Sequence, residues 1–578
     1  MSLTSVLNIG RSALSASQVA IQVAGNNMAN ATTPGYSRQV VSLAPQRGGG
    51  TTQGASIGLG VQVRDVRRQV DDALTGRLWT STADQAAAGT QHQILSQIES
   101  ILGELGDNDL SSELSSFFKT WSEASNGSAS AAAVVNQGAK LSSFVKSLRS
   151  DLSQQRTLLD EQLSEVVRSA NEMLTRVAEL NGAIYDAEGG GSTANVLRDQ
   201  RDQVITELSA LLEVSVVDRG QQGVDVLVGS TPVVLGSSSR GLEIRRENEN
   251  GEVRTRILVS QSQTQIDVSS GQIGALADGR TGSLDSAISA LDDVASRLIF
   301  EVNKLHSTGR NLRGFSSLSG SRTVRVADRN VPLNDPTNET FGGLPFGATT
   351  GGFVVQVRNT ATGASQSRRI AVDLDGRTAA GLPGTADDTS AEDIRAALNG
   401  VSGVRASFDA EGKLVVTADE GLEMSFSEDS SGVLAVLGMN AYFTGTNGAD
   451  IAVRSDLESN PALLARGRDT EAGFVENGTS LAITGLQSLR IAALSDRSIS
   501  EAWRDAAQSV GNQTATAKSR SEAATVVTES LTAQRASVSG VSLDEEAVNL
   551  INYQRQYQGA ARLIALADEL TQTLLNLV

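Results

Sequence analysis

The sequence predicts a multidomain protein of the α plus β class. Terminal helices pair as a coiled coil, a bundle of long helices follows, and β-rich outer domains are inserted in a nested, hairpin-like order. Apolar residues recur three and four apart at both ends of the chain. The same spacing is sustained over 141–184, and it changes to a period of two in the middle of the chain. At 578 residues the chain exceeds a single hydrophobic core, so several domains are expected.

The segments 3–28 and 543–578 at the two ends are predicted to be amphipathic helices. A surface helix cannot hide an apolar stripe of this kind by itself, so each helix needs a helical partner. We therefore expect the two ends to pair with each other and then with other copies of the chain. The stripe consists of Leu3, Leu7, Leu14, Ile21, Ala24 and Met28 at the front, and of Leu550, Tyr553, Tyr557, Ala560, Ile564, Ala567, Leu574 and Val578 at the back.

The charges at the two ends differ in sign. No Asp or Glu precedes Asp65, whereas the C-terminal segment is weakly acidic. This difference favours pairing of the ends, although solvation of an ordinary surface explains it equally well. The residues concerned are Arg11, Arg38, Arg47 and Arg64 at the front, and Asp544, Glu545, Glu546, Asp568 and Glu569 at the back.

Long helices are predicted between residues 68 and 212. Before them, a turn at Thr33–Tyr36 ends the front helix, because the residue before Pro34 avoids the helical region and Gly35 permits a turn. Residues 37–66 are expected to be extended. The pattern over 141–184 predicts a helix roughly 66 Å long, which indicates a long bundle. Gly189–Gly191 end this helix, and another is predicted at about 194–212.

Two β regions are predicted between the helices. Alternating apolar residues indicate a small β domain at 213–270, with Asn248–Gly251 as a hairpin tip. A ββαββ insert is predicted at 351–445, with a capping signal for its helix at Thr389–Asp393. The predicted domains are a terminal coiled-coil assembly domain (1–45 and 530–578), a long-helix bundle (46–212, 271–314 and 476–529), a β domain (213–270 with 315–350 and 446–475) and the outer insert (351–445).

Composition excludes several classes of function. The formal net charge is −18 and no basic cluster occurs, so a nucleic-acid partner is not expected. No apolar run reaches the roughly 20 residues of a membrane span, so membrane insertion is not expected. The chain has no cysteine, which excludes disulfides and cysteine-ligated metals. The N-terminus does not resemble a secretory signal, so an extracellular location requires another export route.

Candidate catalytic and metal-binding residues are few. His92 and His306 stand in helical segments without an H-E-x-x-H pattern, so both are interpreted as structural or solvated. Asp373–Gly376 resembles the start of a calcium loop, but it lacks the further ligands and the distal Glu, so a turn is favoured. We therefore expect no enzyme activity, no cofactor and no metal.

Three of the few tyrosines stand near the ends of the chain, at Tyr36, Tyr553 and Tyr557. Tyrosine is favoured in buried interfaces because it combines apolar area with a hydrogen-bonding tip. These residues therefore indicate subunit contacts, and packing between the two end helices of one chain is an equally good explanation.

Several motifs resemble those of a known family. Residues 26–36, Asn-Asn-Met-Ala-Asn-Ala-Thr-Thr-Pro-Gly-Tyr, resemble the signature shared by bacterial flagellar rod, hook and hook-associated proteins. Ser37–Gln39 resembles the form found in the hook–filament junction members of that family. Further similar stretches are Gly58–Val61 with Arg68 and Asp71, Leu197–Asp202, and Ser539–Glu546 with Asn549, Leu550, Tyr553, Gln554, Tyr557 and Gln558.

The resemblance implies a structural junction protein of the bacterial flagellum. Its terminal helices would line the inside of a tubular assembly of many copies, between the hook protein and the second hook–filament junction protein. It would be exported without a cleaved signal through the flagellar type III pathway, with a cytoplasmic chaperone bound to the C-terminal helix. The expected interface residues are Leu3, Leu7, Leu14, Ile21, Asn26, Asn27, Asn30, Pro34, Gly35, Tyr36, Leu550, Tyr553, Tyr557, Ile564, Leu570 and Leu574.

Three alternatives remain open at the level of sequence. The nearest is another flagellar axial protein, a hook or distal rod subunit, against which the long helices at 141–212 argue. A secreted adhesin that binds a ligand through its β regions is a second alternative. A secreted hydrolase is a third, and the lack of a histidine cluster argues against it.

Overall fold

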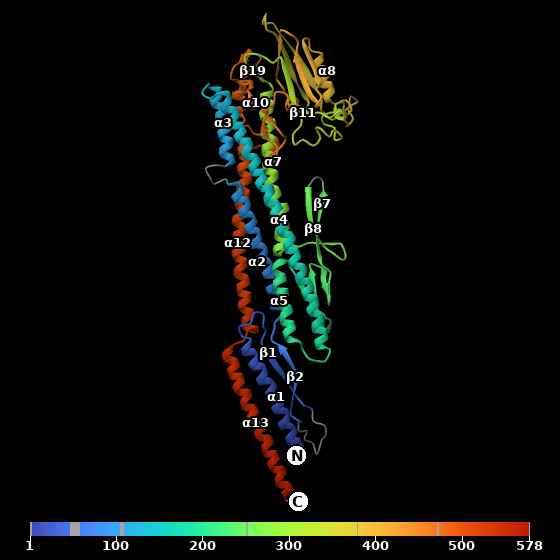
Figure 1. The fold of residues 1–578 in the computed structure, drawn as a ribbon, viewed down its shortest axis with the longest axis vertical. Coiled ribbons are helices and arrows are strands. Elements are labelled where there is room, and N and C mark those ends of the chain that lie inside the picture. Colours follow the sequence, from blue (N-terminus) through green and yellow to red (C-terminus); the bar gives the residue numbers. More distant parts are fainter. Residues whose placement is uncertain are drawn as a thin grey trace. The chain divides into compact units, whose positions relative to one another are not determined.

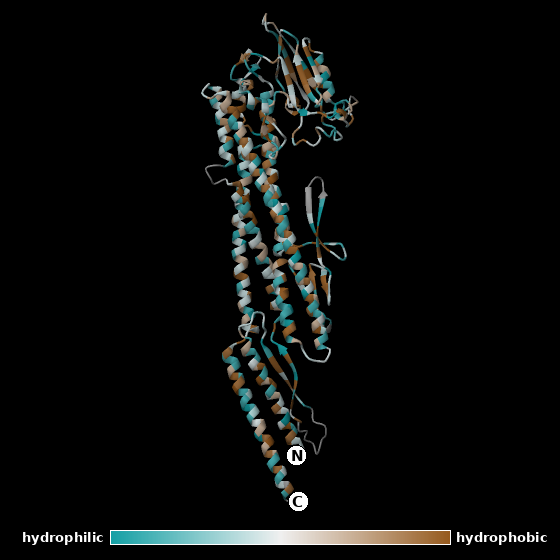
Figure 2. Cartoon of the chain, in the orientation of Figure 1, coloured by the Kyte–Doolittle hydropathy of each residue, from teal (hydrophilic) through white to brown (hydrophobic). Residues whose placement is uncertain are grey.

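The computed structural model describes residues 3–46, 58–103, 109–249, 252–378, 380–470 and 473–576 (Figure 1). Helix accounts for 54% of the residues and strand for 19%, which confirms the predicted α plus β class. Apolar and polar residues alternate along the helices, as amphipathic packing requires (Figure 2). Within the described part of the chain, no helix combines the length and the apolar character that crossing a membrane requires.

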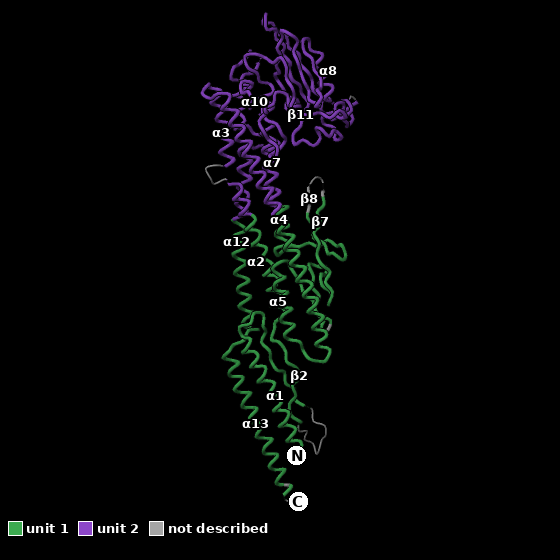
Figure 3. Tube along the Cα trace, viewed as in Figure 1, with its two compact units in different colours: residues 1–94, 159–281, 515–578 green, residues 95–158, 282–514 purple. Residues whose placement is uncertain are grey.

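The chain divides into two compact units (Figure 3). Unit 1 comprises 1–94, 159–281 and 515–578, and unit 2 comprises 95–158 and 282–514. Three long helices contribute residues to both units: α2 (Asp72–Leu102), α4 (Ala131–Glu188) and α12 (Ile499–Ser539). The predicted helix at 141–184 lies within the 58 residues of α4. The apolar pattern that predicted this helix therefore covers only its central part.

The two ends of the chain lie together in unit 1. The N-terminal helix α1 (Leu3–Ala29) packs beside the C-terminal helix α13 (Leu543–Asn576) (Figure 1). After α1, strands β1 (Gln39–Pro45) and β2 (Val61–Arg68) pair antiparallel, and both contact α1. The pairing of the terminal helices is thereby confirmed. The predicted extended region 37–66 is present in β1 and β2, while residues 47–57 lie outside the described residues.

The rest of unit 1 contains helix α5 (Asn195–Leu211) and two antiparallel sheets. One sheet has the order β3 (Ser215–Asp218), β4 (Val224–Val228), β5 (Thr231–Leu235) and β6 (Ser238–Ser239). The other has the order β7 (Leu242–Glu249), β8 (Glu252–Val259) and β9 (Thr264–Ile266). Glu249 pairs with Glu252. The predicted hairpin is therefore present, while Asn250 and Gly251 at its tip lie outside the described residues.

The helical part of the predicted bundle segment 271–314 begins at its first residue. Helix α6 (Gly271–Asp278) continues through a π-helical turn at Gly279–Leu284 into α7 (Asp285–Ser307). The buried Arg280 in this turn donates from Nε to Oδ1 of Asp160 over 2.8 Å. The π-helical turn thus contains a buried arginine that is paired with an aspartate, and charged and polar residues of this kind give no apolar pattern in the sequence.

Unit 2 combines helices with three-stranded sheets. Helices α3 (Leu110–Ser125), α7 and α11 (Gly478–Gly485) pack together. One sheet has the order β13 (Ser365–Val372), β12 (Gly351–Asn359) and β16 (Leu422–Ser427), and a second has the order β11 (Ser317–Thr323), β15 (Lys413–Ala418) and β14 (Val404–Phe408). Helix α8 (Ala391–Asn399) begins with the predicted capping box, between Ser390 and Asp393.

The remaining elements of unit 2 are short. They are β10 (Gly309–Arg310) with β19 (Gly467–Thr470) and β20 (Gly473–Val475) in one sheet, the pair β17 (Phe443–Thr444) and β18 (Ala452–Val453), and helices α9 (Val433–Val436) and α10 (Ser455–Ser459).

The strand pairing corrects the predicted grouping of the β regions. All strand partners described for 213–270 lie within that range, in unit 1. The strands from 315–350 and 446–475 pair inside unit 2 instead, where β11 joins the predicted insert through β15. The insert also contains β16, which was not predicted, and its two hairpins belong to two different sheets. Alternation of apolar residues identifies a strand but not its partner. The other predicted domain boundaries stay a prediction.

Aromatic side chains concentrate at one place in unit 2. Phe117 and Trp121 of α3 lie against Tyr442, Phe117 also lies against Phe443 and Phe118, and all five are at most 1% exposed. The ring centroids of Trp121 and Tyr442 are 5.4 Å apart. The Tyr442 hydroxyl donates to the carbonyl oxygen of Val134 over 2.7 Å, which satisfies its buried polar atom.

His306 borders this aromatic cluster and is fully buried. Its Nδ1 donates to the carbonyl oxygen of Asn440 over 2.7 Å, and its Nε2 accepts from the backbone N–H of Ala465 over 3.2 Å. Burial lowers the pKa of His306 to about 3, against the opposing effect of the hydrogen bond to Asn440. The residue is therefore neutral in the folded chain, in agreement with its interpretation as structural.

Unit 2 is expected to lose stability in acid through His306. The unfolded chain binds a proton near the ordinary pKa of 6.5 and the folded chain only near 3, so stability present above pH 6.5 is lost as the pH falls towards 3. The loss is at most about 1.4 kcal/mol per pH unit. We expect His306→Gln to flatten the pH dependence of the urea unfolding midpoint, followed by tryptophan fluorescence. His92→Gln serves as control and is expected to leave it unchanged. Equal slopes for the two variants would contradict this role.

Candidate interface at the paired chain ends

The contact between α1 and α13 is centred on small residues. On α1 the buried positions include Gly10, Ser17 and Ala24, spaced by seven. On α13 the buried positions Ala560 and Ala567 have the same spacing. Repeats of seven place one face of each helix against its partner. Ala24, Ala560 and Ala567 of the predicted stripe are buried in this contact, whereas Gly10 and Ser17 were not part of the stripe because they carry no apolar signal.

The large apolar residues of the predicted stripe flank this centre. Most are half-buried in the isolated chain, and Tyr557 is 37% exposed. Leu570, an expected interface residue outside the stripe, is 50% exposed. The side chain of Leu574 and the whole of Val578 lie outside the described residues. The half-buried residues are Leu3, Leu7, Leu14, Ile21, Met28, Leu550, Tyr553 and Ile564.

Gly10 lies where the two helices approach each other closely. A Cβ atom added at Gly10 would lie 2.7 Å from Cγ1 of Ile564 and 3.7 Å from the carbonyl oxygen of Ala560. Gly25 of the same helix has nothing within 4 Å of such an atom. Both glycines lie in α1, but only Gly10 has a close neighbour on α13.

We expect Gly25→Ala to stabilise the chain and Gly10→Ala not to do so. Alanine at an open helical position stabilises by about 0.5–1 kcal/mol, because glycine loses more backbone entropy on folding. Gly25→Ala should therefore stabilise α1, whereas Gly10→Ala should push against Ile564 and fail to gain this amount. The thermal unfolding midpoint, followed by far-UV circular dichroism, checks this. A gain at Gly10 equal to that at Gly25 would mean that the helices do not approach so closely.

A cluster of hydrogen-bonded residues joins the two ends beyond the helix pair. We call Asn27, Tyr36, Arg38 and Glu546 the terminal polar node. Asn27 is 1% exposed, and its amide uses both donors and its oxygen. Nδ2 donates to the carbonyl oxygen of Gln39 over 2.9 Å and to Oε2 of Glu546 over 3.1 Å. Oδ1 accepts from the backbone N–H of Gln39 over 3.0 Å and from the Tyr36 hydroxyl over 2.8 Å.

Arg38 completes the node with an ion pair to the C-terminal helix. Its Nε and Nη2 lie 2.9 Å and 2.7 Å from Oε1 of Glu546, and its Nη1 lies 3.0 Å from Oε2 of Glu545. The Glu546 side chain is 3% exposed and that of Glu545 is 63% exposed. Opposite charges at the two ends thus do pair, as one of the two sequence interpretations predicted. Loss of the buried contact would leave a buried polar group without its partner, whereas loss of the exposed one would not.

Helix α5 is tied to the same region by a second set of polar contacts. Arg68 of β2 forms ion pairs with Asp199 over 2.9 Å and with Asp202 over 2.7 Å. Asp199 also accepts from the backbone N–H of Ser37 over 3.3 Å, and Asn195 donates from Nδ2 to the carbonyl oxygen of Val66 over 2.7 Å. Burial raises the pKa of Asp199, against the ion pair with Arg68.

The turn after α1 is shaped by Gly35 and Tyr36. Gly35 has a φ of +79°, and a Cβ atom there would lie 2.9 Å from Oε1 of Gln203, so another residue would be strained. Burial, with the negative charges of Asp199 and Glu546, raises the pKa of Tyr36 to about 12. The Tyr36 hydroxyl therefore stays protonated at neutral pH and donates to Asn27.

The predicted motif residues thus separate into two groups. Asn27, Gly35 and Tyr36 are positioned by contacts inside unit 1. Asn26 and Pro34 are exposed, and Asn30 is half-buried and donates to Asn26. Sequence reasoning did not single out Gly10, Arg38, Asp199 or Glu546 as interface residues, although the opposite charges at the two ends indicated Arg38 and Glu546. An interface role for the predicted residues toward other copies stays a prediction.

A second apolar face of α13 remains exposed after pairing with α1. Val548, Ile551, Leu566 and Leu570 are each at least 50% exposed. At 3.6 residues per turn they lie within an arc of about 100° on the helix. Arg555 and Arg562, both exposed, fall on the same arc between them. Exposed large apolar side chains gathered on one face indicate a surface that another molecule covers.

Four family models match the chain. The model for the flagellar hook-associated protein FlgK helical domain matches 95–319, and that for the flagellin hook IN motif matches 384–420. The model for flagella basal body rod protein matches 7–36, and that for the C-terminal part of flagellar basal body rod FlgEFG protein matches 532–577. The last two segments contain Asn27 and Glu546, so the matched ends meet in the terminal polar node.

Of three relatives of known identity, two cover the whole chain and the third covers about half of it. Flagellar hook-associated protein 1 of Salmonella typhimurium is 27% identical over 605 residues, with 100% of both chains covered. The protein of that name from Escherichia coli is 26% identical over 588 residues, again with 100% of both covered. That of Bacillus subtilis is 29% identical over 289 residues, which covers 48% of this chain and 55% of the relative.

A solved structure of the flagellar hook junction protein FlgK from Burkholderia pseudomallei is also similar. It has a TM-score of 0.48 and 16% identity, and covers 80% of this chain and 100% of its own. The chain is thus similar from end to end to flagellar hook-associated protein 1 of Salmonella typhimurium and Escherichia coli, and models of flagellar axial proteins match its two ends and its middle.

Proposed function

We propose that this chain is a structural junction protein that connects the hook to the filament of the bacterial flagellum and assembles with itself through its paired terminal helices. The observation that carries the proposal is the construction of the ends. The terminal polar node fixes α13 to α1, while Val548, Ile551, Leu566 and Leu570 stay exposed. A helix pair that presents a second apolar face is suited to pack against further copies in a tube.

The proposed partners follow from this role. They are other copies of the chain, the flagellar hook protein on one side and the second hook–filament junction protein on the other. The proposed location is outside the cell, after export without a cleaved signal peptide. Before assembly, a cytoplasmic export chaperone would cover the exposed face of α13, because the same apolar side chains would otherwise aggregate. We expect no catalysis by this protein.

Another flagellar axial protein, a hook or distal rod subunit, is the second candidate. The rod-protein models match only the two ends, at 7–36 and 532–577. The match of 95–319 to the hook-associated helical domain favours the junction protein. A secreted adhesin has no comparable support.

The proposal is tested by deleting the gene and complementing it with the full chain or with a chain that lacks 570–578. Deletion is expected to leave hooks without filaments in electron micrographs, with flagellin released into the medium. The truncated chain should restore neither filaments nor chaperone binding in a pull-down, because it loses Leu570 and the end of α13. Filaments on the deletion strain would overturn the junction role, and filaments on the truncated strain would overturn the role of the terminal helix.

A further inference from the structure

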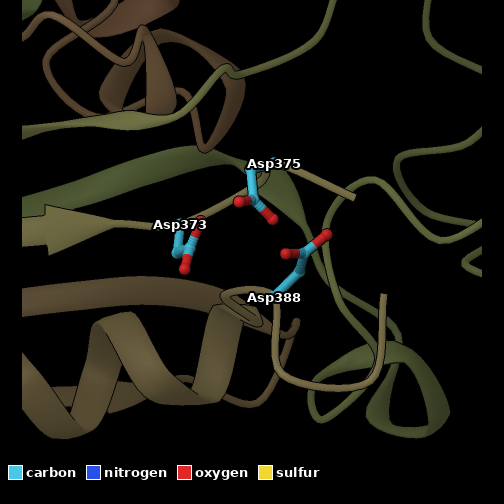
Figure 4. Close-up of side chains that lie close together, drawn as sticks. All are labelled: Asp373, Asp375 and Asp388. Atoms are coloured by element: carbon cyan, nitrogen blue, oxygen red, sulfur yellow. The ribbon is translucent and has the colours of Figure 1, made fainter. Parts of the chain in front are cut away.

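Three carboxylates meet beside helix α8 in unit 2. Asp373 follows β13 directly, Asp375 stands two residues later, and Asp388 precedes the cap of α8. One oxygen of each lies within 4.8 Å of the other two. Figure 4 shows the three side chains turned toward a common space.

The side chain of Asp388 carries the observation that points to a ligand. Asp388 is 3% exposed. Its Oδ2 accepts from Nδ2 of Asn334 over 2.6 Å and from the backbone N–H of Gly376 over 3.1 Å. Its Oδ1 is buried and has no hydrogen-bond partner among the described residues. A buried carboxylate oxygen without a donor is costly, because it has lost water and gained nothing in return.

The surrounding charges do not compensate this cluster. Among the described residues, no Lys or Arg forms an ion pair with Asp373, Asp375 or Asp388. The neighbouring Arg377 extends instead to the carbonyl oxygen of Gly381, over 3.5 Å. Three like charges at this separation repel one another unless a cation lies between them.

We propose that Asp373, Asp375 and Asp388 bind a calcium ion. Carboxylate oxygens are the ligands that hard divalent cations take in proteins, and calcium accepts six to eight oxygens in flexible geometry. Water and loop carbonyls would complete the shell. Magnesium demands a near-ideal octahedron and is usually held by one or two carboxylates with several waters, so three carboxylates on a loop favour calcium.

The fold brings the third ligand to the motif that the sequence shows. Asp373-Leu374-Asp375-Gly376 lacked further ligands when considered alone, and Asp388 supplies one from thirteen residues beyond Asp375. Thr389 holds the two ends of this loop together: its backbone N–H donates to the carbonyl oxygen of Asp373 over 2.7 Å, and its hydroxyl oxygen accepts from the N–H of Asp373 over 2.8 Å. The site is therefore prearranged by the backbone.

The test is calcium binding by the full chain, measured by isothermal titration calorimetry with calcium chloride and, separately, with magnesium chloride. Extracellular calcium modules have dissociation constants of about 0.1–1 mM, and we expect a value in that range. Asp375→Asn changes an exposed residue and should weaken binding at least about tenfold. Asp388→Asn should do the same. Asp387→Asn, an exposed neighbour outside the cluster, is the matched control and should bind as the wild type does.

A second measurement separates binding at this loop from binding elsewhere. Trypsin cleavage after Arg377 should slow in about 5 mM calcium in the wild type and in Asp387→Asn, and should not respond to calcium in Asp375→Asn. Three results would overturn the proposal: no calcium binding by the wild type up to about 10 mM, wild-type affinity in Asp375→Asn, or tighter binding of magnesium than of calcium.

Discussion

Replacing Glu546 with alanine is expected to detach the C-terminal helix from the rest of unit 1. The Glu546 carboxylate is nearly fully buried and accepts from Asn27 and Arg38. Its loss leaves an amide hydrogen of the buried Asn27 without its acceptor and Arg38 with only Glu545. Breaking a buried ion pair costs about 3–5 kcal/mol. We expect about 3 kcal/mol here, at the lower end of that range, because Arg38 is partly exposed and keeps one partner.

Amide hydrogen exchange measures this effect locally, which matters because a chain of two units need not unfold in one step. A loss of about 3 kcal/mol makes opening of α13 roughly 100-fold more frequent. Glu545→Ala removes the same charge from the neighbouring position, where the side chain is 63% exposed. An exposed ion pair contributes about 0–1 kcal/mol, so this variant should exchange nearly as the wild type does. Equal exchange in the two variants would show that the terminal polar node does not hold the helix.

The helices of this fold were predictable because their signal is local. The spacing of apolar residues over 141–184 lies within α4. The described residues of the stripes at both ends lie within α1 and α13. Each pattern lies within one continuous segment. Apolar residues that recur with a period of 3.6 form one face of a helix, and this is enough to predict the helix. The residues at the centre of the helix pair were harder to predict. Gly10 and Ser17 are not large apolar residues, so the apolar spacing does not select them.

Contacts between distant segments were not predictable in the same way. Asn27 and Glu546 are separated by 519 positions. The apolar stripes and the opposite charges indicated that the two ends pair, but neither singled out this hydrogen bond. The β strands show the same limit, since β11 pairs with β15 across the insert and not with the strands of 213–270. Asp388 likewise became a candidate ligand only when the fold placed it beside Asp373 and Asp375.

Replacing Leu566 and Leu570 together with aspartate is expected to abolish assembly while leaving the isolated chain folded. Both side chains are at least half exposed on α13, so they contribute little to the fold of a single copy. In an assembled tube the same positions would be buried, and two carboxylates would then be desolvated without partners. We expect purified protein with unchanged helix content by circular dichroism, and hooks without filaments when this variant complements the deletion strain.

The matched control is a double substitution of Gln554 and Gln572 with aspartate. Both glutamines are exposed on α13, outside the arc that holds Leu566 and Leu570. The control adds the same two charges and the same residue type to the same helix, so it reproduces any loss of helix propensity, which is a few tenths of a kcal/mol per residue. Filaments with the control and none with the leucine variant would place the assembly surface on the exposed apolar face. Filaments with both would mean that this face is free in the tube, and an unfolded leucine variant would mean that these side chains already belong to the core of one copy.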